Sequence, residues 1–263
     1  MIELKKLSGG YGQFEAVHDV SLSLLNGQIT AVIGPNGCGK STLLKLCCGQ
    51  LHPSRGEVLA DGRPLSALSR TDIARKIALL PQSRTVPDIT VGSLVLHGRF
   101  PWLDYPRVYR TEDKAAAEES MKRMGIWEKR HKLLARLSGG ERQKTYLAMV
   151  LAQNTGHVFL DEPTTYLDIA HQLELLVFLS ELKQEGKCVV TVLHDLGMAL
   201  EAADRIAVMK DGRLMITGTP EQVIASGAIE DAFGVKLRRR EQIGFECLEP
   251  QRTEGFRVPT ADP

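Results

Sequence analysis

The pattern of apolar and polar positions predicts strands along the first third of the chain. Residues 1–30 alternate apolar and polar side chains between glycines, which is typical of short antiparallel strands. Residues 29–33 form a compact β-branched run and predict a buried strand. A glycine-rich turn and a helix over 40–51 follow it. Two further short strands are predicted at 56–62, closed by an Asp-Gly turn, and at 77–80.

The pattern becomes helical in the middle of the chain and then alternates between strand and helix. Residues 111–124 are rich in Glu, Lys and Ala and predict a helix, and another helix starts at Ser138. The elements expected after that are strand 157–160, helix 169–185, strand 187–193, helix 196–203 and strand 205–209. This alternation predicts an α/β fold, a mostly parallel sheet with helices on its faces, and a helical subdomain inserted in it.

Composition and charge describe an ordinary globular chain and narrow its partners. A hydrophobic content of 43% with 25% charged residues excludes the disordered and fibrous classes. The formal net charge of +1 provides no overall field that would favour nucleic acid or anionic lipid. No apolar run approaches the roughly 20 residues that span a bilayer, and the first residues lack the apolar stretch of a secretion signal. We therefore expect a cytosolic chain.

The turn after the strand at 29–33 carries the pattern G-x-x-x-x-G-K-[ST]. It reads Gly34-Pro35-Asn36-Gly37-Cys38-Gly39-Lys40-Ser41. Glycines let the backbone wrap around a polyphosphate, and the start of the following helix favours an anion. We expect Lys40 to reach the β- and γ-phosphates and the Ser41 hydroxyl to bind Mg²⁺. A plain glycine turn would have no use for the Lys-Ser pair, so the pattern predicts nucleotide binding.

Acidic and polar side chains follow several of the predicted strands. Asp161 and Glu162 come directly after the strand at 157–160, and parallel sheets bind ligands at the carboxyl ends of their strands. Asp161 is placed to hold Mg²⁺ through water, and Glu162 to act as general base on an attacking water. Alone, such a pair is usually a solvated turn. His194 follows the strand at 187–193 and is expected to contact the γ-phosphate, although a lone histidine is more often structural. Gln82 follows the strand at 77–80 and could contact Mg²⁺ or the water.

The segment Leu137-Ser138-Gly139-Gly140-Glu141 predicts a second anion site. Ser138 is expected to cap the following helix, and Glu141, three residues later, completes a capping box. The two glycines would leave backbone N–H groups exposed at the start of the helix. One nucleotide does not account for two phosphate sites far apart on one chain. Two copies arranged head to tail could pair them, each closing over the nucleotide of the other.

With these motifs in this order, the chain resembles an ATP-binding cassette (ABC) ATPase subunit along nearly its whole length. The matching segments are Gly34 to Thr42 (Walker A), Gln82 (Q-loop), Leu137 to Glu141 (signature), Val158 to Glu162 (Walker B), Leu167-Asp168 (D-loop) and His194 (switch histidine). Tyr11 falls where the family stacks an aromatic ring on adenine. Glu141 stands where glutamine is common, and Tyr166 departs from the small residue often found in the D-loop.

The resemblance implies a P-loop ABC ATPase fold with an antiparallel β-subdomain. The implied parts of the single domain 1–263 are a catalytic core (1–87 and 157–235), a helical signature-bearing subdomain (88–156) and a C-terminal tail (236–263). Two copies would bind two ATP–Mg²⁺ between them, with Ser138, Gly139, Gly140 and Asp168 reaching the other copy's nucleotide. Integral membrane permease subunits and, indirectly, a substrate-binding protein are the implied partners, at the cytoplasmic face of the cell membrane, without nucleic acid.

A narrower resemblance concerns the transported substrate. Residues 96–101, which read Leu-His-Gly-Arg-Phe-Pro, and residues 164–172 are similar to the group that imports iron–siderophores, haem or cobalamin. This similarity implies iron–siderophore import first, with haem and cobalamin behind it. Within the helical insert, Phe100-Pro101-Trp102 and Tyr105-Pro106 are candidates for docking on the permease or, equally, for the core of the insert.

Two other functions compete with this one. A P-loop kinase or another small-molecule enzyme would explain the phosphate turn but neither residues 137–141 nor His194. A non-transport ABC ATPase acting on nucleic acid or the ribosome usually carries tandem cassettes or long coiled-coil inserts, and this chain shows neither. The basic run 238–240 could suggest RNA, but three arginines in a tail are usually a solvated face.

The cysteines fit a reducing compartment, with one reactive exception expected. They are Cys38, Cys47, Cys48, Cys188 and Cys247. Their spacing matches neither a metal site nor an even disulfide framework, so most are expected to be buried thiols. Cys38 lies inside the phosphate turn, where the helix start and Lys40 favour a thiolate. We therefore expect thiol reagents to inactivate the protein through Cys38 and ATP to protect it.

Overall fold

The structure, a computed structural model, describes residues 1–82, 86–164 and 167–236. Several positions discussed above lie outside the described residues, namely Tyr166, the basic run 238–240, Cys247 and the rest of the tail from residue 237. The described residues form two compact units. The first contains residues 1–82, 155–164 and 175–236, and the second contains residues 86–154 and 167–174.

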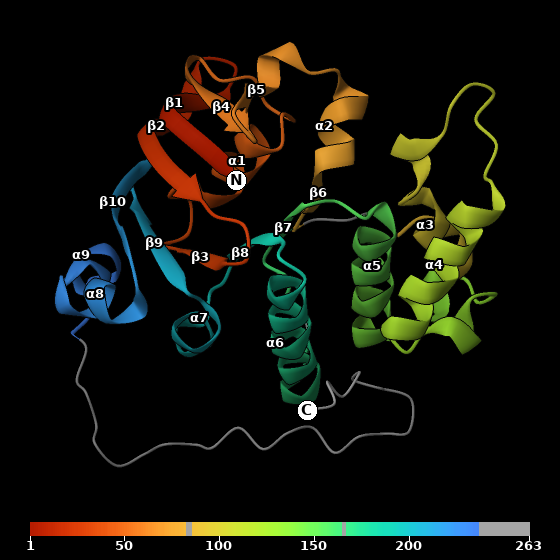
Figure 1. Ribbon diagram of the computed structural model, residues 1–263. Helices are drawn as coiled ribbons and strands as arrows, with labels where there is room; N and C mark the ends of the chain where they lie inside the picture. Colours follow the sequence, from red (N-terminus) through yellow and green to blue (C-terminus); the bar gives the residue numbers. More distant parts are fainter. Residues whose placement is uncertain (83–85, 165–166, 237–263) are drawn as a thin grey trace, which may run out of the picture. The chain divides into compact units, whose positions relative to one another are not determined.

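The first unit contains a mostly parallel sheet with the described strands in the order β10-β9-β3-β8-β7-β6 (Figure 1). The bounds are β3 (Ile29–Ile33), β6 (Ile77–Leu80), β7 (His157–Asp161), β8 (Cys188–Val192), β9 (Arg205–Lys210) and β10 (Arg213–Gly218). Among these described strands, only β10 pairs antiparallel, with β9. Every residue of β3, β7 and β8 is buried, as expected for central strands of a parallel sheet. Their carboxyl ends therefore meet at one edge of the sheet.

A four-stranded antiparallel sheet, with the order β2-β1-β4-β5, completes the strands described in the first unit. Its strands are β1 (Ile2–Tyr11), β2 (Phe14–Leu24), β4 (Arg55–Ala60) and β5 (Arg63–Pro64). The hairpin between β1 and β2 places Tyr11 opposite Phe14. Both sheets contribute to one hydrophobic cluster, which includes Leu7, Leu24 and Val190. The predicted α/β fold with an antiparallel β-subdomain is thus confirmed.

Helix α1 (Lys40–Cys47) connects the two sheets, because it contacts β1, β2 and β7 and its apolar residues are buried. The sequence predicted that this helix would run to Leu51, which was too long. The helix ends at Cys47, with Cys48 as its C-cap, because Gly49 adopts a φ of +67° that a right-handed helix does not allow. The N–H of Gly49 instead bonds to the carbonyl of Leu46.

The other helices of the first unit are short, apart from one. They are α2 (Arg70–Lys76), α7 (Leu196–Ala202), α8 (Pro220–Ala225), α9 (Ala228–Phe233) and the 3-10 helix η1 (Leu65–Ala67). Helix α6 (Ile169–Gln184) begins in the second unit and continues into the first. Helices α8 and α9 pack beside β9 and each other (Figure 1). The thiols of Cys47, Cys48 and Cys188 are buried, as the sequence predicted, and burial raises the pKa of Cys188 to about 12.

The described part of the second unit is helical. Its helices are α3 (Val91–His97), α4 (Thr111–Arg123), α5 (Gly139–Gln153) and the 3-10 helices η2 (Phe100–Trp102), η3 (Trp127–Lys129) and η4 (Leu134–Arg136). Helices α3, α4 and α5 pack on one another. The guanidinium of Arg99 joins the start of α4 to the end of α5: Nε lies 3.0 Å from Asp113 Oδ1, and Nη1 donates to the carbonyl of Ala152 at 3.0 Å.

Some of the aromatic residues that could dock on the permease or belong to the core of the insert pack inside the insert, and others lie on its surface. The indole N–H of Trp102 donates to the carbonyl of Gln153 at 2.8 Å, so Trp102 belongs to the packing of the insert. Phe100 is 47% exposed and Tyr105 is 97% exposed, which places both on the surface. Among the described residues, no helix combines the length and apolar character needed to span a membrane.

Candidate functional site

The turn that precedes α1 is built by glycines for which no other residue fits. Gly34 and Gly39 have φ values of +154° and +98°, which L side chains rarely adopt. A Cβ on Gly34 would lie 2.2 Å from the carbonyl oxygen of Met209, and one on Gly39 would lie 2.3 Å from that of Ala16. Gly39 also caps α1, and no side chain of the described residues caps this helix. The first N–H groups of the helix therefore suit an anionic ligand.

Lys40 holds a buried charge at the centre of this turn. The residue is 5% exposed, and Nζ donates to the carbonyl oxygens of Gly34 at 2.8 Å and Pro35 at 2.9 Å. The third donor of the ammonium group faces Cys38 Sγ at 4.0 Å, a weak acceptor that a phosphate oxygen could replace. The turn thus carries a positive charge whose position is fixed by the turn's own backbone, and this arrangement fits a polyphosphate.

Ser41 and Asp161 bring oxygen ligands to the same place from two different elements. Ser41 is in the first turn of α1, Asp161 is the last residue of β7, and the Ser41 hydroxyl donates to Asp161 Oδ1 at 3.0 Å. Burial raises the pKa of the Asp161 carboxyl, and the Ser41 hydrogen bond partly offsets this. A hydroxyl and a carboxylate are hard oxygen donors of the kind that Mg²⁺ prefers. The described residues hold no cluster of three or more His, Cys, Asp or Glu that could bind a metal ion.

Glu162 is held between the ends of three neighbouring strands. It follows β7 with a φ of +50°, a left-handed conformation that is uncommon for a residue with a side chain and clusters at functional sites. Its Oε2 accepts from Gln82 Nε2 at 2.5 Å, and its Oε1 lies 2.5 Å from Nε2 of His194. Gln82 follows β6 and His194 follows β8. The structure therefore brings together the three polar residues that the sequence placed at this edge.

These groups line one cavity of about 440 Å³. From the turn and α1 its lining includes Asn36, Gly37, Gly39, Lys40, Ser41 and Thr42. From the other elements it includes Tyr11, Phe14, Ala16, Gln82, Glu162 and His194. A cavity of this size is within the range of small-molecule and cofactor sites. Gly34, Pro35 and Cys38, which the sequence placed among the nucleotide-binding residues, build the turn beneath the cavity.

The sequence missed Phe14 as a wall of this cavity. Phe14 is 71% exposed and stands opposite Tyr11 across the β1–β2 hairpin. Tyr11 is 47% exposed, and its hydroxyl accepts from Lys45 Nζ at 3.0 Å. Two exposed aromatic rings at one end of a polar cavity suit a planar ring such as adenine. The signal was available: Tyr11 and Phe14 flank a two-residue turn that contains Gly12.

The structure contradicts the thiolate that the sequence predicted at Cys38. The thiol is 5% exposed, and burial raises its pKa, although Lys40 Nζ at 4.0 Å acts in the opposite direction. Its Sγ lies beneath Gly34, where a Cβ would approach it to 2.8 Å. The side chain belongs to the hydrophobic cluster of the first unit. Desolvation therefore outweighs the helix start and the lysine that favoured a thiolate.

The predicted capping box is present at the start of α5 in the second unit. Ser138 Oγ accepts from the Glu141 N–H at 3.3 Å, and Glu141 Oε2 accepts from the Ser138 N–H at 2.9 Å. Lys129 also bonds to Glu141, and these contacts lower the pKa of that carboxyl to about 2. Gly139 is exposed, but Gly140 is buried, so the expectation that both glycines are open holds for Gly139 alone. Asp168 lies in the same unit at the start of α6.

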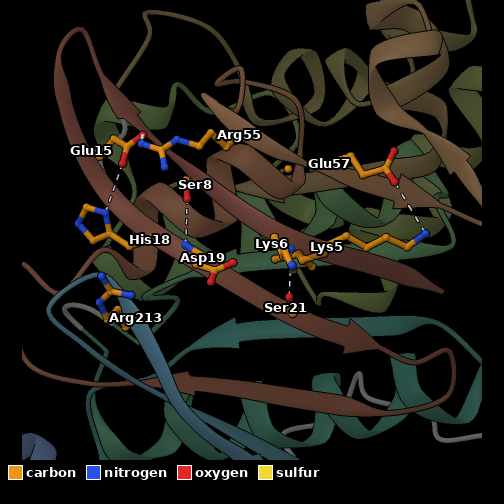
Figure 2. Close-up of a pocket in the computed structure, with 12 residues that line it drawn as sticks. Lys5, Lys6, Ser8, Glu15, His18, Asp19, Ser21, Arg55, Glu57 and Arg213 are labelled. Atoms are coloured by element: carbon orange, nitrogen blue, oxygen red, sulfur yellow. Dashed lines mark hydrogen bonds and ion pairs between the residues drawn. The ribbon is translucent and has the colours of Figure 1, made fainter.

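Another hollow, of about 1220 Å³, is lined by β1, β2 and β4 and by Arg213 of β10 (Figure 2). Its acidic and basic side chains lie close to one another. Glu15 Oε2 is 3.4 Å from Nδ1 of His18, its Oε1 is 4.0 Å from Arg55, and Lys5 lies 3.7 Å from Glu57. The lining carries both charge signs, with four basic residues (Lys5, Lys6, Arg55 and Arg213) and three acidic residues (Glu15, Asp19 and Glu57), so the charges nearly balance and select no ligand.

Comparison with known proteins agrees with this geometry. The family described as ABC transporter matches residues 17–165. The ferric enterobactin transport ATP-binding protein FepC of Escherichia coli K12 is 40% identical over 234 residues, which cover 88% of this chain and 86% of FepC. The hemin import ATP-binding protein HmuV of Nocardia farcinica is 42% identical over 227 residues, which cover 86% of this chain and 78% of HmuV.

A solved structure shows the same fold. The protein cbiO1 of Clostridium perfringens, part of the ABC transporter complex cbiONQ, superposes with a TM-score of 0.74 at 26% identity. The superposition covers 88% of this chain and 92% of cbiO1. The family match spans more than half of the chain, and both sequence relatives exceed 30% identity over most of their length. The chain therefore belongs to the ABC transporter family, as one of its ATP-binding and ATP-hydrolysing subunits.

Proposed function

We propose that this ATPase subunit powers an importer, that it works as a pair of copies beneath a membrane permease, and that the cargo is an iron–siderophore complex. One observation carries the catalytic part of the proposal. The Glu162 carboxylate, held between Gln82 and His194, lines the same cavity as Lys40 and Ser41. A base and a phosphate-binding cation in one cavity are what hydrolysis of a nucleoside triphosphate requires.

Binding of ATP begins at the turn and α1. The Lys40 ammonium and the backbone N–H groups of residues 37–42 hold the β- and γ-phosphates, and the adenine lies against Tyr11 and Phe14. The turn is fixed by Lys40 bonding to its own backbone, so little further ordering is needed when ATP binds.

Hydrolysis follows from the arrangement around Glu162. Its carboxylate takes a proton from a water, the water oxygen attacks the γ-phosphorus in line, and the bond from that phosphorus to the bridging oxygen breaks. His194 donates a hydrogen bond to the γ-phosphoryl oxygens. Gln82 keeps the Glu162 carboxylate oriented and responds to the helical unit that follows it in sequence. Catalysis is then mainly positioning and electrostatic stabilisation.

Mg²⁺ fits the oxygen donors beside the phosphate turn. Ser41 would hold the ion directly, Asp161 through a water, and Gln82 would lie near it. A bound Mg²⁺ supplies charge neutralisation on the β- and γ-phosphate oxygens. The Ser41–Asp161 hydrogen bond of 3.0 Å keeps these two donors side by side.

A second copy would complete the site. Ser138, Gly139 and Gly140 at the start of α5 and Asp168 at the start of α6 belong to the second unit and do not line the cavity. The helix start suits a γ-phosphate. In a head-to-tail pair these residues of one copy would close over the ATP of the other.

Membership of the ABC transporter family suggests the partners of the pair. We propose that permease subunits receive the pair at the cytoplasmic face of the membrane and that a substrate-binding protein delivers the cargo. The exposed rings of Phe100 and Tyr105 in the second unit are the docking residues that we propose. The names of the two sequence relatives concern ferric enterobactin and hemin, both of which contain iron, and this supports an iron complex as cargo.

Uptake by cells that lack the chain tests this proposal. We expect such cells to lose uptake of a ferric siderophore labelled with radioactive iron. The wild-type chain should restore it, and so should Lys5→Ala, an exposed lysine of the antiparallel sheet, whereas Lys40→Ala should not. If the cells instead lose uptake of haem or of cobalamin, that compound is the cargo and the iron–siderophore proposal is wrong. Unchanged uptake of all three compounds would contradict an importer.

A further inference from the structure

The imidazole of His171 lies directly on the second residue of α5. A Cβ built on Gly140 would meet Nε2 of His171 at 2.5 Å and its Cδ2 and Cε1 at 2.8 Å. These distances are too short for any real Cβ, so the ring occupies the place that a side chain at position 140 would need. Position 140 therefore requires glycine for two reasons: the His171 ring leaves no room for a side chain, and an anion needs access to the backbone. Both residues belong to the second unit.

The same imidazole is fixed from its other side by Asp168. Nδ1 of His171 lies 2.6 Å from Asp168 Oδ1, and the backbone N–H of His171 donates to the same oxygen at 2.9 Å. The backbone and side-chain hydrogen bonds from His171 lower the pKa of the Asp168 carboxyl. An ionised carboxylate only accepts, so Nδ1 of His171 donates to Asp168, and Nε2 lies toward Gly140.

A second contact joins the same two helices one turn further along. Lys144 Nζ of α5 lies 2.9 Å from Oε1 and 2.7 Å from Oε2 of Glu174 in α6. Gly140 and Lys144 are four residues apart, and His171 and Glu174 are three apart, so each pair shares one helix face. The first two turns of α5 and of α6 are therefore held together at two points.

We propose that His171 is a positioning residue that joins the Asp168 segment and the Ser138–Gly140 segment into one surface. The inference rests on the proposed function, in which both segments reach the nucleotide of the other copy. Nδ1 of the ring bonds to Asp168 Oδ1, and Nε2 lies on Gly140. A shift of either segment would therefore move the ring and, with it, the other segment. The competing role is local: the histidine supports only the Asp168 cap of α6.

Substitutions at position 171 separate the two roles. Asparagine places an amide donor near the position of Nδ1, so His171→Asn keeps a bond to Asp168 but removes the ring atoms that lie on Gly140. His171→Ala removes both contacts. A matched control is His18→Ala, because His18 is also a partly exposed histidine paired with a carboxylate, Glu15 at 3.4 Å, but lies in the first unit.

The readout is ATP-dependent pairing in a Glu162→Gln background, followed by light scattering against protein concentration. We expect His171→Ala to raise the concentration for half-pairing roughly tenfold, the size of effect that loss of a charged hydrogen bond produces. His171→Asn should raise it as well, because this variant loses the ring atoms that lie on Gly140. His18→Ala should leave it unchanged. Binding of a fluorescent ATP analogue to the single copy should not change in any of them, because the cavity belongs to the first unit.

Four results would overturn the inference. Full pairing of His171→Asn would leave only the local role, and full pairing of His171→Ala would leave no role. Loss of analogue binding together with a large fall in melting temperature would mean that His171 merely supports folding. If the Glu162→Gln parent itself does not pair with ATP, the proposed head-to-tail arrangement fails, and the inference fails with it.

Discussion

Replacing Glu162 by glutamine should remove the base of the reaction and leave its surroundings in place. The amide oxygen of the new side chain can still accept from Gln82 Nε2, and the amide NH₂ can donate to His194 Nε2 when that ring carries its proton on Nδ1. Glutamate and glutamine meet the same strain at a φ of +50°. The residue is only 9% exposed, but the substitution keeps its shape. We therefore expect a folded protein with an intact cavity.

The expected loss of turnover follows from what the carboxylate contributes. A positioned general base accelerates proton transfer by roughly 10²- to 10⁴-fold, which corresponds to about 3–5 kcal/mol of activation free energy. We expect kcat for ATP hydrolysis to fall within that range. The affinity for ATP should stay within about twofold of wild type, because the lysine, the turn and the aromatic rings that hold ATP are untouched.

The assay is release of phosphate at saturating ATP, together with equilibrium binding of ATP to the same preparations. Glu57→Gln serves as control, because Glu57 is a carboxylate of the antiparallel sheet paired with Lys5 at 3.7 Å and is remote from the cavity lining. It should retain wild-type turnover. Near wild-type hydrolysis by Glu162→Gln would refute the assignment of the base. Loss of ATP binding would show instead that Glu162 holds the cavity in shape.

Two further predictions concern the turn and the start of α5. Cys38 should react slowly with N-ethylmaleimide, because its thiol is buried and its pKa is raised; rapid labelling of Cys38 by mass spectrometry would contradict the burial argument. The pKa of Glu141 is lowered to about 2 from its ordinary 4.5. The stabilisation that the ionised Glu141 adds to the folded state is therefore present above pH 4.5 and lost as the pH falls toward 2. We expect urea unfolding to show wild type more stable than Glu141→Gln by about 1 kcal/mol at pH 7, a value reduced for solvent screening, and equal to it near pH 2; a difference that does not vary with pH would refute this.

The parts of the fold that sequence predicted are those in which local pattern and tertiary burial agree. The strand at Ile77–Leu80 was predicted with its observed bounds, because a short apolar run ends at a proline. The predicted start of α5 is confirmed by its capping box. Helix α2 (Arg70–Lys76) was missed because none of its residues is buried, so it has no apolar period to detect. Strand β10 (Arg213–Gly218) was missed because it lies at the sheet edge, where no buried run marks it.

The sequence also predicted some residues of the candidate site and missed or misjudged others. Gln82, Glu162 and His194 come from different strands, and the sequence could place them together because parallel strands end at one edge. Cys38 was misjudged because its thiol lies beneath Gly34, a packing relation that neither the helix start nor Lys40 reveals. Phe14 was missed although the short turn at Gly12 predicts the hairpin that places it opposite Tyr11.

The capping box at α5 indicates how stability and activity are separated at this helix start. It uses the N–H groups of Ser138 and Glu141 for the box itself, and it does not use those of Gly139 and Gly140. Folding of the helix therefore depends on the capping pair, whereas an anion from outside the chain would depend on the glycines. His171 covers Gly140 and leaves Gly139 exposed, which narrows the surface offered to such an anion. A substitution of Glu141 should thus appear first in unfolding, and one at Gly139 first in hydrolysis.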